Sequence, residues 1–234
     1  MLILHVIFTL LILAASYASY KAGKLTLAGA VTGGVVAALV YLGTGYIGIA
    51  VLAMFFLLSI LATSHKKVEK RKLSDEHPEK RDALQVLANG GLPAILGLLA
   101  FIMPENILLA TVLMAAAFAS ATADTLSSEL GIIYGKRFYN ITTFKVDERG
   151  RDGVVSIEGI LIGLGGSVII AVIFALNFGL NSLFLSIIIA GTVGNLSDSV
   201  LGAVLERRGY INNNEVNFLN GIFAVIACSL LIFL

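Results

Sequence analysis

The chain has 234 residues, of which 58% are hydrophobic and only 13% are charged, and its mean hydropathy is +0.94. This composition excludes an ordinary soluble domain and is typical of a polytopic α-helical membrane protein. The formal net charge of +1 indicates no charged partner, and the sequence lacks the basic stripe with interleaved aromatic residues that is typical of nucleic-acid binding.

Eight apolar runs follow one another along the chain, and a membrane-spanning helix needs about 20 such residues. The runs predict spans at 2–20, 25–42, 46–63, 83–103, 106–123, 154–176, 182–205 and 218–234. The first run lacks the basic start of a signal peptide, so we expect it to be retained as a span. The predicted fold class is all-α, a bundle of about eight transmembrane helices that forms one integral membrane domain over 1–234.

Basic residues occupy every second loop between these runs. All 16 lysine and arginine residues lie in the segments 21–24, 66–81, 136–151 and 207–208, and the other loops contain none. By the positive-inside rule, the four basic loops are cytoplasmic and both termini are outside. We expect the loop 66–81 to be solvated and to face lipid headgroups.

Carboxylates gather near the predicted cytoplasmic ends of the later spans. Asp198 lies deep in the seventh run, where a charged group costs roughly 2.5–3.5 kcal/mol on insertion scales. Asp124 and Glu129 lie at the end of the fifth run, whereas residues 1–63 contain no acidic residue. The pattern thus predicts three acid-free spans, 1–63, and a five-span catalytic portion, 83–234, with its site at the cytoplasmic face.

The residue types around these carboxylates indicate phosphate chemistry. Several carboxylates in one desolvated place repel each other, and a hard cation such as Mg²⁺ relieves that repulsion while it binds phosphates. The loop 136–153 adds five basic residues together with glycines, and their charges and backbone N–H groups suit a polyphosphate. Acids for a metal beside bases for phosphates predict a phosphoryl- or nucleotidyl-transfer site.

The geometry of the fifth span leaves one question open. Asp124 and Glu129 are five residues apart, so their side chains diverge by roughly 140° on a straight helix. A break in the helix near Ser127, Ser128 and Gly131 would let both carboxylates face one cleft. Whether Asp124, Glu129 and Asp198 share one metal ion is not decided by this spacing.

Other roles and other functions compete with a phosphate-transfer site. Asp198 and Asn195 can serve as hydrogen-bond partners between helices, and the basic residues of 136–151 can serve as membrane anchors. An ion-coupled transporter is one alternative, although the acids crowd one side of the membrane instead of spreading through its depth. A lipid cytidylyltransferase is another, because it needs the same metal and phosphate groups.

Four motifs between Ala83 and Asn220 carry a resemblance to a known family. They are QVLANGG at 85–91, ADTLSSELG at 123–131, GRDGVVSIEG at 150–159 and GNLSDSVLGA at 194–203. In order and spacing they resemble the transmembrane protein nineteen family, integral membrane proteins that include the plant phytyl-phosphate kinase of tocopherol synthesis. One departure is that Arg151 and Asp152 stand where relatives usually carry a Thr-Asn-like pair.

The resemblance implies a membrane kinase with its active site facing the cytoplasm. It would transfer a phosphoryl group from a nucleoside triphosphate, CTP or ATP, to an isoprenyl monophosphate and yield the diphosphate. It implies Mg²⁺ on Asp124, Glu129 and Asp198, with Lys145 as a further catalytic residue. The implied residues for binding substrate and nucleotide are Asn89, Lys136, Arg149, Arg151, Asp152, Gly153, Ser156, Glu158, Asn195, Ser199 and Asn217. Its partners would be an isoprenoid lipid phosphate, the nucleotide and membrane lipids, while isoprenoid length and oligomeric state stay open.

Overall fold

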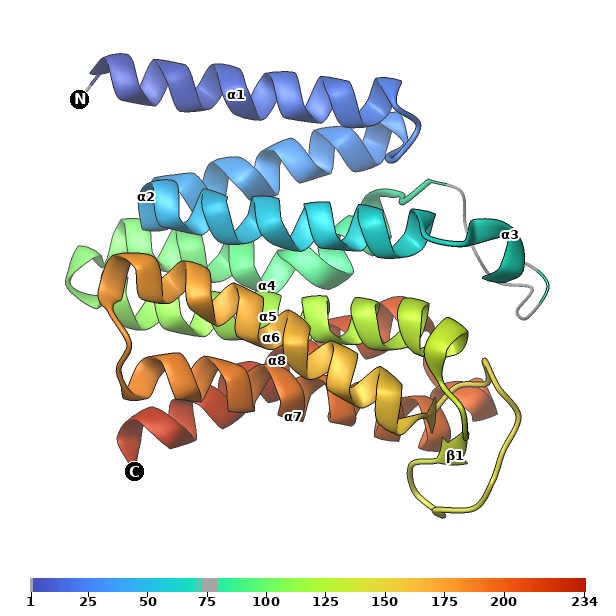
Figure 1. Cartoon of the computed structure of the whole chain (residues 1–234). Coiled ribbons are helices and arrows are strands. Elements are labelled where there is room, and N and C mark those ends of the chain that lie inside the picture. The colour runs from blue at the N-terminus through green and yellow to red at the C-terminus, as the bar shows by residue number, and fades with distance from the viewer. Residues whose placement is uncertain (1, 71, 73–79) are drawn as a thin grey trace.

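The computed structural model describes residues 2–70, 72 and 80–234 as a bundle of long helices lying alongside one another (Figure 1). The long helices are α1 (Leu2–Lys21), α2 (Leu27–Ser64), α4 (Ala83–Ile102), α5 (Ile107–Tyr134), α6 (Ile157–Phe178), α7 (Ser182–Val204) and α8 (Asn213–Phe233). The short elements are helix α3 (Lys67–Lys70), the 3-10 turns η1 (Pro104–Asn106) and η2 (Glu206–Arg208), and the strands β1 (Tyr139–Asn140) and β2 (Val154–Val155). The two strands pair antiparallel.

Helix α2 is a helical hairpin. A continuous helix of its 38 residues would be about 57 Å long, nearly twice the thickness of the bilayer hydrocarbon. Gly45 breaks it with φ 64° and ψ −147°, a conformation that is accessible to glycine and unfavourable for other residues. The chain reverses there, so that 27–44 and 46–64 lie side by side (Figure 1).

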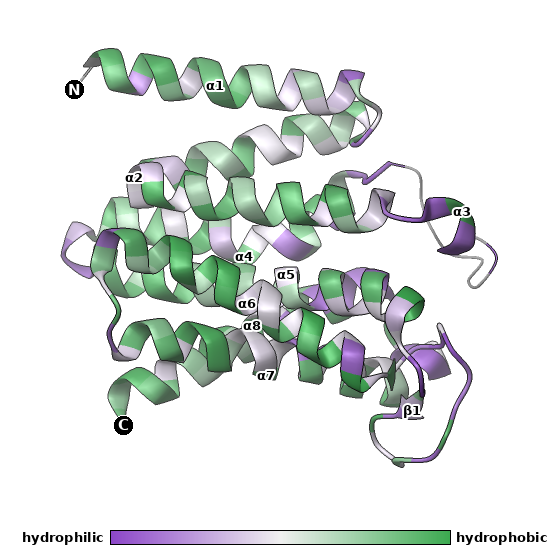
Figure 2. Ribbon diagram, in the orientation of Figure 1, coloured by the Kyte–Doolittle hydropathy of each residue, from purple (hydrophilic) through white to green (hydrophobic). Residues whose placement is uncertain are grey.

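Seven helices in the described part of the chain are long and apolar enough to cross a membrane. Because α2 folds back on itself, they supply eight apolar segments, which agrees with the predicted number. Hydrophobic residues cover most of the helix surfaces, and hydrophilic residues concentrate at the end that carries α3 and β1 (Figure 2). The prediction of an all-α membrane bundle is confirmed.

Helix α5 lies at the centre of this bundle. It packs against α2, α4, α6, α7 and α8, and every residue of 110–123 except Leu113 is buried. Its alanine-rich stretch 115–123 presents small side chains that allow neighbouring backbones to approach closely. Phe118 is fully buried and its ring centroid lies 5.5 Å from that of Phe55 in α2. The helix that carries Asp124 and Glu129 is therefore held on all sides.

Three helix boundaries differ from the predicted spans by three residues or more. Helix α5 continues to Tyr134 instead of ending at 123. Helix α6 begins at Ile157 instead of 154, because Ser156 caps it by accepting a hydrogen bond from a backbone N–H. Helix α8 begins at Asn213 instead of 218, because Asn212 and Glu215 form a capping box. Hydropathy misses the polar end of α5 and the polar start of α8, and it assigns the apolar Val154 and Val155 of β2 to the span of α6.

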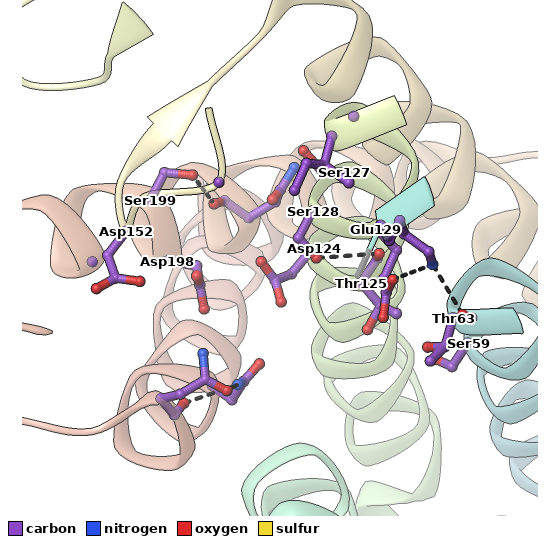
Figure 3. Close-up of a pocket in the computed structure, with 18 of the residues that line it drawn as sticks. Ser59, Thr63, Asp124, Thr125, Ser127, Ser128, Glu129, Asp152, Asp198 and Ser199 are labelled. Carbon is purple, nitrogen blue, oxygen red and sulfur yellow. Dashed lines mark hydrogen bonds and ion pairs between the residues drawn. The ribbon is translucent and has the colours of Figure 1, made fainter. Parts of the chain in front are cut away.

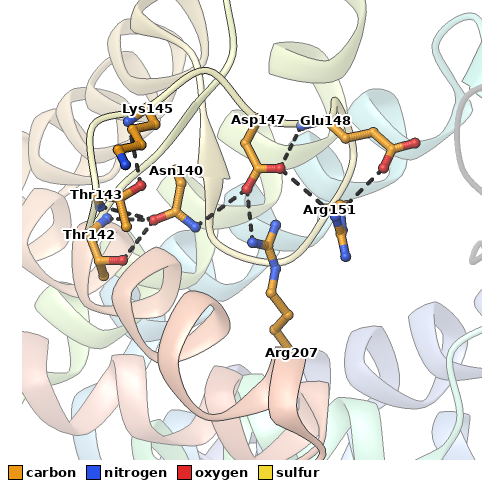
Figure 4. A network of polar contacts seen from close by, with 8 residues as sticks. All are labelled: Asn140, Thr142, Thr143, Lys145, Asp147, Glu148, Arg151 and Arg207. Carbon is orange, nitrogen blue, oxygen red and sulfur yellow. Dashed lines mark hydrogen bonds and ion pairs between the residues drawn. The ribbon is translucent and has the colours of Figure 1, made fainter.

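The loop between α5 and α6 folds over the end of α7. Asn140 Oδ1 accepts hydrogen bonds from two following backbone N–H groups, which turns the chain after β1. Asp147 Oδ2 accepts a hydrogen bond of 2.8 Å from Arg207 Nη1 in η2 (Figure 4). This ion pair ties the loop to the segment that leaves α7.

A glycine lets the same loop touch α7. Gly153 has φ 71°, and a Cβ atom added there would lie 2.4 Å from the backbone nitrogen of Ala203. A side chain is therefore excluded at this position, and the loop backbone rests directly on the helix.

Candidate functional site

A cavity of about 610 Å³ lies among the ends of the helices next to this loop. Its wall includes residues of α2, α3, α4, α5, α7, α8 and the loop segment 150–156. The charged residues in the wall are Lys24, Lys67, Lys70, Arg81, Asp124, Glu129, Arg151, Asp152, Asp198 and Glu206. One cavity therefore holds charges of both signs.

Asp124 of α5 and Asp198 of α7 face each other in this cavity (Figure 3). Their carboxyl groups are close enough to influence each other electrostatically. Asp198 Oδ2 also accepts a hydrogen bond of 2.8 Å from Asn220 Nδ2, and Asn220 Oδ1 accepts one of 3.1 Å from Ser120 Oγ. Since Asn220 is fully buried, this chain of contacts holds the Asp198 carboxylate in one orientation.

The facing carboxylates favour a cation or a shared proton between them. Two such groups cannot both stay charged at close range without a counter-charge, and Asp152 and Glu206 add negative potential around the pair. Mg²⁺ is usually bound by one or two carboxylates, several waters and the phosphates of a substrate. The donor set fits this ion, because Asn195 also lines the cavity one turn before Asp198.

Glu129 does not join this pair. Helix α5 stays continuous through Ser127, Ser128 and Gly131, so the helix does not break there and Glu129 points away from Asp124. The helix nevertheless presents both carboxylates to the one cavity, each toward a different part of the wall (Figure 3).

The partner of Glu129 is Lys70 of α3. The two side chains form an ion pair, and Lys70 Nζ also donates hydrogen bonds to the backbone oxygens of Ala62, at 2.7 Å, and Thr63, at 3.0 Å. The Lys70 side chain is 1% exposed. All three ammonium protons therefore have acceptors, and these contacts attach α3 to α2 and α5.

The predicted metal set of three carboxylates needs a correction. Across 2–70, 72 and 80–234, no three His, Cys, Asp or Glu side chains form a group that could hold a metal ion. Glu129 forms an ion pair with Lys70. It does not reach the other two carboxylates, because the continuous helix directs its side chain away from Asp124. The candidate ion site consists of the Asp124–Asp198 pair.

Cationic groups from separate segments meet beside the last turn of α2. Lys24 Nζ donates to Ser64 Oγ at 3.0 Å, and the backbone N–H of Arg81 donates to the Lys24 carbonyl at 3.1 Å. Burial lowers the pKa of Arg81, and the charges of Glu129 and Asp124 partly offset that effect. The guanidinium stays cationic at neutral pH, because its ordinary pKa is above about 12.

The prediction that loop 66–81 is solvated and faces headgroups is wrong for Lys70 and Arg81. Both line the cavity, and Lys70 is buried in an ion pair. Arg71 and the positions 73–79 of the same loop lie outside the described residues.

Two hydroxyls of α2 face this part of the cavity without partners. Ser59 and Thr63 line it (Figure 3), and their buried oxygens make no hydrogen bond. Helical Ser and Thr commonly donate to the carbonyl four residues earlier, as Thr44 and Ser186 do here. A buried hydroxyl left unpaired costs about 1–3 kcal/mol, so a pair of them marks a place for ligand atoms.

Most of the predicted site residues line the cavity. They are Asn89, Asp124, Glu129, Arg151, Asp152, Gly153, Ser156, Asn195, Asp198, Ser199 and Asn217. Two of them also have a structural role, since Ser156 caps α6 and Gly153 contacts α7. The chemical roles assigned to this set stay predictions.

Four predicted residues are not part of the cavity wall. Lys145 is exposed in the loop, and Lys136 donates its backbone N–H to Glu158 Oε2 at 3.3 Å. Arg149 lies over the ring of Phe138, 5.1 Å from its centroid. The basic residues of 136–151 thus mostly build the loop, while α3 and the segment before α4 supply several of the cavity's cations.

The cavity also contains residues that the sequence did not single out. Lys70 and Arg81 look like any other lysine and arginine of a basic loop, and Ser59 and Thr63 are ordinary members of an apolar run. The spacing of Ser59 and Thr63, one helical turn apart, was the one readable signal. Their lack of hydrogen-bond partners appears only in three dimensions.

Known proteins resemble this chain over most of its length. The family model described as integral membrane protein DUF92 matches residues 10–225. The chain belongs to this family. That membership confirms the resemblance to the transmembrane protein nineteen family that the four motifs indicated.

Similar proteins include one from an archaeon and two from a plant. The chain is 37% identical over 191 residues to the uncharacterized membrane protein MJ0933 of Methanocaldococcus jannaschii, which covers 80% of this chain and 79% of that protein. It is 29% identical over 221 residues to Protein PGR of Arabidopsis thaliana, covering 83% and 76% of the two chains. It is 27% identical over 185 residues to the chloroplastic Protein VTE6 of Arabidopsis thaliana, covering 75% and 56%. No solved structure matches.

Proposed function

We propose that this protein is a membrane kinase that transfers the terminal phosphoryl group of a nucleoside triphosphate to an isoprenyl monophosphate. The product is the isoprenyl diphosphate. The observation that carries the proposal is the facing pair Asp124 and Asp198 in a cavity that also contains cations. The similarity to VTE6 adds support, because the family resemblance implies this reaction.

The side chains suit a reaction that depends on positioning and charge neutralisation. Asp124 and Asp198 would hold Mg²⁺, with Asn195 beside them. Bound there, the ion would neutralise charge on the transferred phosphates. Arg81 and Arg151 lie in the same wall and would bind phosphate oxygens, whose negative charge they match.

No strong general base is required for this transfer. An oxygen of the acceptor phosphate forms a bond to the terminal phosphorus as the bond to the bridging oxygen of the nucleotide breaks. The electrons of that bond leave with the nucleoside diphosphate. The acceptor oxygen is already ionised, so no proton has to be removed from it.

We also propose that the cavity faces the cytoplasm. The described basic residues of 66–81 and those of 136–151 lie at the same end of the bundle as the cavity (Figure 2). Under the positive-inside rule that end is cytoplasmic, where nucleoside triphosphates are present.

Replacing Asp198 with asparagine tests this proposal. Asp198→Asn keeps an oxygen for the bond from Asn220 but removes the charge, so we expect transfer to fall roughly a hundredfold or more with folding intact. Glu105→Gln is the matched control, because Glu105 lies in η1, outside the cavity wall. The measurement is diphosphate formation by purified protein, together with its melting temperature. Full transfer activity in Asp198→Asn would contradict the proposed role of Asp198 in the kinase site.

A further inference from the structure

One face of α2 combines apolar and hydroxyl side chains at the cavity. Phe56, Ser59, Ile60 and Thr63 all line it, and their spacing of three and four residues places them on one side of the helix. Phe56 is deepest in the apolar run, and Thr63 lies about 10 Å nearer the end of the helix. The inner end of this face is therefore apolar, at Phe56, and its outer end is polar, at Thr63, while Ser59 and Ile60 lie next to each other between them.

The hydroxyls on this face have the character of ligand-binding groups. Ser59 is 1% exposed, and neither its oxygen nor that of Thr63 has a hydrogen-bond partner. Each can donate one hydrogen bond, and a phosphate oxygen is an acceptor. Lys70, whose ammonium group contacts the Thr63 carbonyl, has all three protons engaged, so the two hydroxyls are free donors on this face.

The surroundings add positive charge without blocking the face. Arg81 and Lys24 are bound to each other beside Ser64, the residue that follows Thr63. The Asp124–Asp198 pair lies farther along the same cavity, beyond Glu129 (Figure 3). A phosphate on α2 would thus lie apart from the acidic pair yet within the same cavity.

We propose that this face of α2 is the acceptor subsite and takes a phosphate monoester that carries an apolar chain. The Ser59 and Thr63 hydroxyls donate hydrogen bonds to its phosphate, and the first isoprene units lie on Phe56 and Ile60. The identity of the acceptor as an isoprenyl monophosphate rests on the proposed function. The chemistry of recognition follows from these four side chains.

Binding measurements without nucleotide test the subsite. Geranylgeranyl monophosphate is titrated into the purified full-length protein by calorimetry, in parallel with inorganic phosphate and with geranylgeraniol. We expect Ser59→Ala and Thr63→Val each to weaken binding of the monophosphate roughly tenfold, since each removes a hydrogen bond to a charged group. Binding of geranylgeraniol is expected to be unchanged in both variants.

Matched controls make the same chemical changes away from the cavity. Thr44→Val in α2 and Ser186→Ala in α7 each remove a hydroxyl that donates to the carbonyl four residues earlier. We expect both to bind within about twofold of the unmodified protein. An equal loss in the controls, or no loss in Ser59→Ala and Thr63→Val, would overturn the subsite.

The tail is tested separately from the head. We expect the monophosphate to bind more tightly than inorganic phosphate, and Ile60→Ala to reduce that preference. Equal affinity for the two probes would overturn the assignment to a lipid.

Transfer assays separate this subsite from the proposed function. If Ser59→Ala and Thr63→Val transfer phosphate with an unchanged KM for the acceptor, the subsite is contradicted and the kinase proposal still holds. The opposite result is also informative. If both variants lose binding of the monophosphate, but the unmodified protein transfers phosphate from no nucleotide, the subsite is supported and the kinase proposal is contradicted.

Discussion

At the scale of single residues, the site depends on carboxylates that have different partners. Asp198 is oriented by Asn220 and faces Asp124, whereas Glu129 is neutralised by Lys70. The family resemblance implied all three as metal ligands, and the spacing left open whether they share one ion, because spacing reveals direction along a helix but not which neighbour lies opposite. Only the packing of α3 against α5 assigns Glu129 to a lysine.

The Lys70–Glu129 pair predicts that the stability of the folded protein depends strongly on both partners. Lys70→Met leaves the Glu129 charge buried without a partner, and we expect a loss of about 3–5 kcal/mol in the free energy of unfolding. The double variant with Glu129→Leu should recover much of that loss, because it removes the unpaired charge. Denaturant unfolding of the four proteins in this cycle measures the coupling. A stable Lys70→Met single variant would show that the pair does not hold α3.

The Asp147–Arg207 pair predicts a pH dependence of loop attachment. A hydrogen bond from the Glu148 N–H and one from Arg207 hold the pKa of Asp147 below its ordinary 3.8. A lowered folded pKa means that the stabilisation is complete above the unfolded value and is lost as pH falls through the folded one. Melting temperatures should therefore differ between Asp147→Asn and the unmodified protein at neutral pH, and converge as the pH falls below the lowered folded pKa of Asp147. A difference that persists in acid would contradict this account.

At the scale of elements, the helices were predictable and their ends were not. Runs of apolar residues identify every long helix, since hydropathy reports what lies in hydrocarbon. The polar last turns of α5 and first turns of α8 carry cavity residues such as Glu129 and Asn217, and hydropathy excludes them from a span. The functional side chains therefore lie where the sequence signal for structure is weakest.

The contact of the loop with α7 predicts that Gly153 tolerates no side chain. Gly153→Ala combines a strained positive φ with a Cβ placed 2.4 Å from Ala203 N, so we expect the loop to detach, with a lower melting temperature and lower transfer activity. Gly165→Ala is the matched control, because a Cβ at this helical glycine meets nothing within 4 Å. That control should be neutral or slightly stabilising. Equal behaviour of the two variants would argue against a packed loop.

At the scale of the whole molecule, the α2 hairpin contributes residues to the site in addition to those from the last five spans. The sequence predicted a division between acid-free spans at 1–63 and a catalytic portion at 83–234. In the structure, Phe56, Ser59 and Thr63 of the first part form one wall of the cavity. The absence of acids concealed this contribution, because hydroxyl and apolar groups carry no charge signal.

Product analysis tests the central claim most directly. Purified protein is incubated with Mg²⁺, geranylgeranyl monophosphate and one nucleoside triphosphate at a time, and the products are identified by mass spectrometry. The account predicts the isoprenyl diphosphate and an equal amount of nucleoside diphosphate with at least one nucleotide. A CMP-linked lipid with released pyrophosphate, or an unchanged monophosphate with every nucleotide, would contradict it.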